Sequence, residues 1–136
     1  MPTFFDSTAD AAEASEALRG LAHPSRGFDQ PAEMYGVIGD LSSGMRSLRQ
    51  ALDQIADVHE RKVAHAFNDA GSHEAGVRDA LAAAEELRQA ANLVDRAYDR
   101  LAEGFIAAGR IAWHPDAAVT EAALSRWVSV VFRSEE

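Results

Sequence analysis

The sequence predicts an all-α protein organised around one long antiparallel helical hairpin with coiled-coil-like pairing. Apolar residues recur in alternating steps of three and four through residues 31–69 and again through residues 73–109, which is the spacing of a coiled-coil seam. In the turn between them, Gly71 suits a left-handed position, and Ser72 followed by Glu74 suits a helix N-cap with an acidic first turn. We expect short N-terminal and C-terminal helices to pack on this hairpin.

The two long segments also agree in register. If they run antiparallel, seam residues at the same height have numbers that add to a nearly constant value: Met34 with Ala108 and Leu48 with Val94 both give 142. Because each helix is patterned independently, this agreement favours the antiparallel pairing. The predicted seam residues are Met34, Ile38, Leu41, Met45, Leu48, Leu52 and Ile55 in the first helix and Val77, Ala80, Ala84, Leu87, Ala91, Val94, Tyr98, Leu101, Phe105 and Ala108 in the second.

Two parts of the hairpin surface are candidate interaction sites. One flank carries small and apolar residues with no charge among them, and because small side chains let helices approach closely, we expect a groove for a further helix. Near the turn, apolar residues lie on the other flank of the hairpin, outside the seam. This position indicates either a second contact site or a surface that the N-terminal helix covers. The candidate residues are Gly44, Ala51, Val58, Ala83, Ala90, Ala97 and Gly104 in the groove and Val63, Phe67 and Leu81 near the turn.

The N-terminal helix is expected over residues 8–21. Ser7 followed by Asp10 resembles a capping arrangement, and Leu18 and Leu21 fall with alanines on one face. Residues 23–27 contain proline and glycine and end this helix. Pro31 of the next segment suits the first turn of the long helix.

The C-terminal helix is expected over residues 116–133. Leu124, Trp127 and Val131 fall on one face at helical spacing, so this helix requires a partner surface. The predicted groove is filled by this helix or by a second protomer, and the sequence leaves both open. We expect most of the aromatic residues near the termini to form a core at the open end of the hairpin, with any exposed ones anchoring a partner; they are Phe4, Phe5, Trp113, Trp127 and Phe132.

Composition limits the classes of function. The 136 residues fit one domain, 1–136, and the absence of cysteine excludes disulfides and thiolate metal sites. A net charge of −9 argues against tight non-specific binding to nucleic acid or to an anionic membrane. The sequence has neither the pattern of a signal peptide nor an apolar run of membrane-spanning length. We therefore expect a cytoplasmic protein that does not bind membranes.

The titratable residues do not form a recognisable catalytic or metal site. His59 and His65 are six residues apart, whereas a zinc helix needs two histidines four apart, and the di-iron pattern fails because Ala56 stands three residues before His59. Arg88, Arg96 and Arg100 are interleaved with acids, as on a solvated helix face. We predict no enzyme activity, no cofactor and no metal.

Three stretches carry a resemblance to a known group of proteins. Residues 1–6 (Met-Pro-Thr-Phe-Phe-Asp), 35–41 (Tyr-Gly-Val-Ile-Gly-Asp-Leu) and 109–113 (Gly-Arg-Ile-Ala-Trp) are similar to an uncharacterised family of small helical proteins in actinobacterial genomes, often near mobile-element genes. The resemblance spans most of the chain to about Trp113, and it implies a setting without implying catalytic residues.

These observations favour a non-enzymatic protein-interaction or regulatory protein that self-associates. Its expected partner is another protein, with a homodimer as one form. The alternative is a nucleic-acid-associated accessory factor of a mobile element, although the charge does not favour nucleic acid as a partner.

Overall fold

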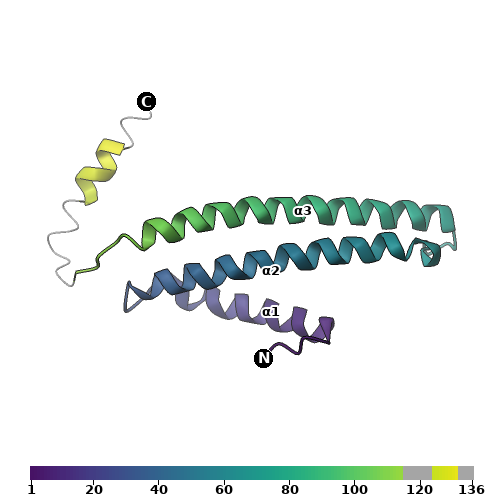
Figure 1. The fold of residues 1–136 in the computed structure, drawn as a ribbon, viewed down its shortest axis with the longest axis horizontal. Coiled ribbons are helices and arrows are strands. Elements are labelled where there is room, and N and C mark those ends of the chain that lie inside the picture. Colours follow the sequence, from purple (N-terminus) through teal and green to yellow (C-terminus); the bar gives the residue numbers. More distant parts are fainter. Residues whose placement is uncertain (115–123, 132–136) are drawn as a thin grey trace.

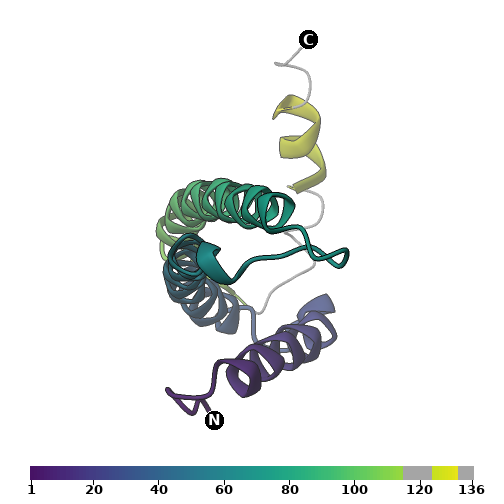
Figure 2. The same cartoon turned by 90° about the vertical axis from the view of Figure 1, so that its right-hand side faces the viewer.

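A computed structural model describes residues 1–114 and 124–131, and all regular structure in this part of the chain is helical. The helices α2 and α3 lie side by side and pack together, whereas α1 and the helical residues 124–131 lie apart from that pair (Figures 1 and 2). The elements are α1 (Ser7–Ala22), the 3-10 turn η1 (Pro24–Arg26), α2 (Glu33–Arg61), the 3-10 turn η2 (Val63–His65) and α3 (His73–Ala108).

Helix α1 begins with a network of short hydrogen bonds. The Asp6 side chain caps the helix by accepting a hydrogen bond from the Ala9 amide at 3.1 Å. The Asp10 carboxylate accepts hydrogen bonds from the Thr3 amide at 2.7 Å, the Thr3 hydroxyl at 3.0 Å and the Phe4 amide at 3.2 Å. The hydrogen bond from the Thr3 amide is the main reason that the pKa of Asp10 lies below its ordinary value.

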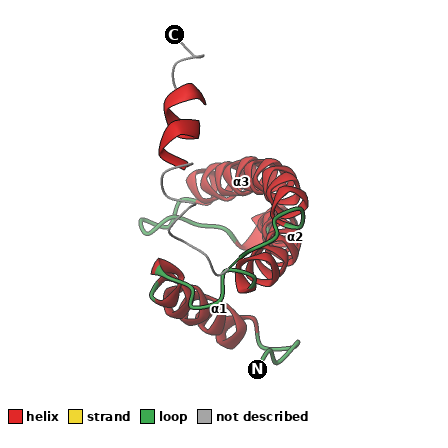
Figure 3. Cartoon of the chain, turned by 90° about the vertical axis from the view of Figure 1, so that its left-hand side faces the viewer, coloured by secondary structure: helices red, strands yellow, loops and turns green. Residues whose placement is uncertain are grey.

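Helix α1 does not pack on α2 or α3, contrary to our expectation. Among the described helical elements it contacts only η1, and none of its residues is buried (Figure 3). The physical reason is its composition. Alanine dominates its apolar face, so little apolar area would be gained by docking, and Leu18 remains exposed.

Helix α2 ends earlier than predicted, before the turn that leads to α3. We expected helix through residue 69, but α2 ends at Arg61, and the chain continues through η2 into an extended Ala66. The turn itself has the predicted chemistry. Gly71 has a φ of 84°, and its amide donates a hydrogen bond to the Asn68 carbonyl at 2.9 Å. Ser72 caps α3 by accepting a hydrogen bond from the Ala75 amide at 3.2 Å.

Gly76 explains why α2 stops early. It is buried in the first part of α3, and a Cβ atom there would collide with the backbone of Ala66 and Phe67. The non-helical segment after η2 therefore passes close to the backbone of Gly76. A continued α2 helix is too wide to approach Gly76 this closely. The His73 side chain also joins this segment, since its Nδ1 lies 2.8 Å from the Ala66 carbonyl oxygen.

The C-terminal helix is only partly described. Residues 116–123 and 132–133 of the predicted helix lie outside the described residues, whereas residues 124–131 are helical. Leu124 and Trp127, which the sequence placed on an apolar face, are exposed there. The described part of this helix thus does not fill the predicted groove.

Gly76→Ala should destabilise the fold, because the new methyl group forces residues 66–67 off α3. We expect a loss of roughly 1–3 kcal/mol in the free energy of unfolding, the usual range for overpacking, measured by urea denaturation followed by circular dichroism. Gly36→Ala is the matched control, since a Cβ there meets nothing within 4 Å, and it should stabilise α2 by about 0.5–1 kcal/mol. Equal losses for the two variants would contradict the close approach at Gly76.

The order of residues 3–6 should depend on pH through Asp10. Because the pKa of Asp10 is lowered in the folded chain, the stabilisation is complete above the ordinary carboxyl value and is lost as the pH falls through the lowered pKa. Hydrogen exchange of the Thr3 amide, followed by NMR, should show protection that disappears in this acidic range. In Asp10→Asn the protection should be weak at every pH, and pH-independent protection in the wild type would refute the assignment.

Candidate interaction surface

Helix α3 presents the predicted seam to α2. Ala84 and Ala91 are buried, and Leu87, Val94 and Leu101 are half-buried at the expected spacing. This helix therefore has the orientation that its heptad pattern predicts.

Helix α2 follows the predicted seam at most positions but not at all of them. Met34, Ile38, Leu41, Met45 and Leu52 are half-buried, as the prediction requires. Ala56, however, is fully buried with an exposed fraction of 0%, whereas the predicted seam residues Ile55 and Leu48 are 46% and 44% exposed. The reason is steric: Ala56 is small enough to pack closely against the small residues of α3.

Ring contacts join the two helices at one end. Tyr35, near the start of α2, stacks on Phe105, near the end of α3, with ring centroids 4.1 Å apart and an interplanar angle of 12°. Gly39 allows this contact, since a Cβ there would lie 3.0 Å from the Phe105 ring. Further along, the Arg46 guanidinium lies 5.7 Å from the centroid of the Tyr98 ring.

One side of the α2/α3 pair is polar. Arg88 of α3 reaches across to Asp57 at 3.0 Å and Glu60 at 2.8 Å, and Arg49 pairs with Asp53 at 3.5 Å. The hydrogen bond to Glu60, followed by that to Asp57, raises the pKa of Arg88 above its ordinary value. The two pairs of Arg88 connect the helices on a face that is open to water, whereas the Arg49–Asp53 pair lies within α2.

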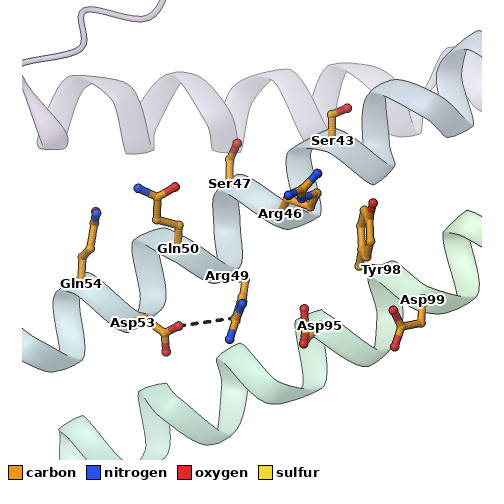
Figure 4. Close-up of a pocket in the computed structure, with 10 residues that line it drawn as sticks. All are labelled: Ser43, Arg46, Ser47, Arg49, Gln50, Asp53, Gln54, Asp95, Tyr98 and Asp99. Carbon is orange, nitrogen blue, oxygen red and sulfur yellow. Dashed lines mark ion pairs between the residues drawn. The ribbon is translucent and has the colours of Figure 1, made fainter.

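An open groove of about 910 Å³ lies on this polar side (Figure 4). Two serines line it, and no histidine does. Its carboxylates come from both helices, Asp53 from α2 and Asp95 and Asp99 from α3, and its guanidinium groups come from α2. The lining residues are Ser43, Arg46, Ser47, Arg49, Gln50, Asp53, Gln54, Asp95, Tyr98 and Asp99.

The histidines near the turn are used in local structure. The Nδ1 atom of His59 lies 2.8 Å from the Ile55 carbonyl oxygen, and the His73 ring contacts Phe67 with centroids 4.9 Å apart. Within residues 1–114 and 124–131, no group of three or more His, Asp or Glu residues is arranged to hold a metal ion. None of the helices in the same ranges combines the length and apolar character that crossing a membrane requires.

The side opposite the ion pairs is apolar, and we call it the apolar face. On α2, Leu48 and Ile55 are joined by Val58, which is 36% exposed. On α3, helical spacing turns Ala90 about half a turn away from Arg88 and so onto this face. The apolar face consists of Gly44, Leu48, Ala51, Ile55 and Val58, which are exposed, with Ala83, Ala90 and Ala97, which are half-buried, and Gly104, which is exposed.

The predicted site residues near the turn are less uniform. Val63 is half-buried in η2, which contacts α3, whereas Phe67 and Leu81 are exposed. Helix α1 does not cover them, because its only contact with a described helical element is with η1.

The aromatic residues at the termini do not form the expected core. Phe4, Phe5, Trp113 and Trp127 are exposed, and Phe132 lies outside the described residues. The sequence placed them inside because aromatic side chains are usually buried, but the two packed helices offer no third element against which to bury them.

Comparisons of this chain with protein families, characterised proteins and solved structures give no match.

The burial of Ala56 between α2 and α3 can be tested with two alanine positions. Ala56→Leu should cost about 1–3 kcal/mol in the free energy of unfolding, because a larger side chain overpacks the buried contact with α3. Ala82→Leu, at an exposed position of α3, should change the stability by less than about 0.5 kcal/mol. Urea denaturation of both variants measures the difference. A neutral Ala56→Leu would show that α2 does not turn Ala56 towards α3.

Proposed function

We propose that this chain is a non-enzymatic, cytoplasmic protein-interaction protein. In this proposal α2 and α3 form an antiparallel, coiled-coil-like hairpin, and its apolar face binds a helical protein surface, including that of another copy. Binding of this kind would allow the protein to act as a regulator of its partner or of its own assembly.

The antiparallel pairing is supported by contacts at three heights along the helices. Tyr35 meets Phe105 at one end, Arg46 lies over Tyr98 further along, and Asp57 pairs with Arg88 towards the turn. Rising numbers in α2 meet falling numbers in α3, as antiparallel helices require.

The observation that carries the proposed function is the exposure of three large apolar side chains along one side of α2. Ala56 occupies the interface, while Leu48, Ile55 and Val58 face outward. Burying a fully exposed side chain of this kind contributes roughly 1.5–3 kcal/mol. Because these three are 36–46% exposed, a partner that covers what remains of them would gain roughly 2–4 kcal/mol in all. Contiguous exposed apolar residues of this kind mark interaction sites in soluble proteins.

The charged residues support a protein partner over nucleic acid. Three of the arginines that could contact phosphate already have other contacts: Arg88 with Asp57 and Glu60, Arg49 with Asp53, and Arg46 with Tyr98. Phosphate binding would have to break these contacts and overcome a net charge of −9.

Ile55→Asp should abolish partner binding, because a carboxylate would be buried at the centre of the contact. We would purify tagged wild-type and variant chains from the cells that produce the protein and identify bound proteins, including untagged copies, by mass spectrometry. Leu18→Asp in α1 is the control, since it makes the same kind of change at another exposed position. Circular dichroism verifies that each variant remains helical. Identical bound proteins for the wild type and Ile55→Asp would refute the proposed role of this face.

A further inference from the structure

We infer that the occupant of the apolar face is a second copy of this chain, and this inference rests on the proposed function. The two copies stack their apolar faces to form a four-helix bundle. The twofold axis runs along the hairpins, so that both turns lie at the same end and α2 of each copy packs on α3 of the other.

The surface area of the chain fits extensive self-association. The accessible area is 10995 Å² for a mass of 14.7 kDa, whereas a compact monomer of this mass exposes about 6,900 Å². The excess is about 4,000 Å² per chain and so about 8,000 Å² for two copies, which is more than the roughly 2,000–5,000 Å² that permanent homodimer interfaces bury from both partners together. A second copy on the apolar face would therefore cover a part of this excess, and helix α1, which packs on neither α2 nor α3, accounts for some of the rest.

The sizes of the side chains select the axis along the hairpins. The bulky members of the face, Leu48, Ile55 and Val58, are all on α2, whereas α3 contributes alanines and one glycine. An axis along the hairpins places bulky α2 on small α3 at both contacts, and facing large and small residues interdigitate well. An axis across the hairpins would instead place α2 on α2 and α3 on α3. The bulky side chains would then hold the two α2 helices far apart, although the two α3 helices would need to lie close together.

An axis along the hairpins also fixes the register, because it leaves every residue at its own height. The residues that face each other are then those already level within one hairpin. Val58 faces the partner's Ala83, and Ala51 faces the partner's Ala90; in both pairs the residue numbers add to 141. No slip of one copy along the other is available to improve or spoil the fit.

The charges at the borders of the face agree with this register. Each border residue except Arg61 precedes a residue of the face by four positions, and Arg61 follows Val58 by three, so each is a neighbour of the face on the helix surface. The border residues are Asp40, Ser47, Gln54 and Arg61 on α2 and Asp79, Glu86, Leu93 and Arg100 on α3.

In the proposed dimer, opposite charges meet at both ends of the face. Asp40 lies beside the partner's Arg100, and Arg61 lies beside the partner's Asp79, each pair adding to 140. Symmetry repeats both pairs. All four side chains belong to exposed residues, and none of the ion pairs found within residues 1–114 and 124–131 uses them. Two chains of net charge −9 therefore meet through an uncharged strip with complementary ends.

Charge exchange tests the arrangement in the full chain. Sedimentation velocity over a range of concentrations should give a dimer for the wild type, and Arg61→Glu should raise its dissociation constant about tenfold, since two attractive pairs become repulsive. Arg61→Glu combined with Asp79→Arg should restore the wild-type value. Arg96→Glu makes the same change of charge on the outer side of α3 and should leave the dimer unchanged.

The position of the turns tests the axis directly. The chain has no cysteine, so Ala70→Cys introduces one spin label per turn. Double electron–electron resonance spectroscopy should give a distance below about 30 Å between the labels of the two copies if their turns lie together. An axis across the hairpins would separate them by about 50 Å, close to the length of the 36-residue α3.

Four results would overturn the inference. A distance near 50 Å, or rescue of Arg61→Glu by Asp40→Arg in place of Asp79→Arg, would show the other axis. A wild type that stays monomeric while Ile55→Asp still loses a bound protein would show a different occupant and would leave the proposed function standing. If Ile55→Asp changes neither assembly nor binding, the proposed function fails as well.

Discussion

The close approach of small residues between α2 and α3 is the contact on which the rest of the structure depends. Ala56, Ala84 and Ala91 are the buried apolar residues of the described chain, and no large side chain there is fully buried. Such an interface brings the backbones near to each other but removes little apolar area from water. Leu48, Ile55 and Val58 of α2 remain largely outside it, whereas Ile38, Leu41, Met45 and Leu52 are half-buried. In the proposed assembly, another surface covers the three exposed side chains.

The two sides of the helix pair differ in the interactions that they make. On the polar side, Arg88 and its two carboxylate partners tie the helices together across an open surface, and exposed ion pairs of this kind add little stability but do fix relative orientation. On the apolar side, none of the residues of the face between Gly44 and Val58 is charged. The charged residues in this part of α2 lie on other sides of the helix. Orientation is thus set on one side, which leaves the other free for association.

Much of the architecture could be predicted from the sequence, because local chemistry decides it. The all-helical class, the turn at Gly71 and Ser72, and the orientation of α3 follow from capping and periodicity. The burial of Ala56 in place of Ile55 does not, because the two residues are adjacent in a broad apolar stripe of α2, and only the shape of α3 selects the smaller one. The early end of α2 depends on a tertiary contact at Gly76. The exposure of α1 and of the terminal aromatics depends on the absence, among the described residues, of a third packed element. The candidate residues of the apolar face were identified, but Leu48 and Ile55 were assigned to the interior.

The close approach of residues 66–67 to Gly76 fixes the position of α2 relative to α3 along their common axis. A change in the length of one helix therefore has to be matched by an equal change in the other. Seven residues added to both α2 and α3 would extend the rod by two turns and keep every face aligned, whereas seven added to one helix alone would misalign every contact between the insertion and the open end. Relatives of this chain that differ in length should accordingly carry paired insertions at equal distances from the turn, with the turn itself unchanged.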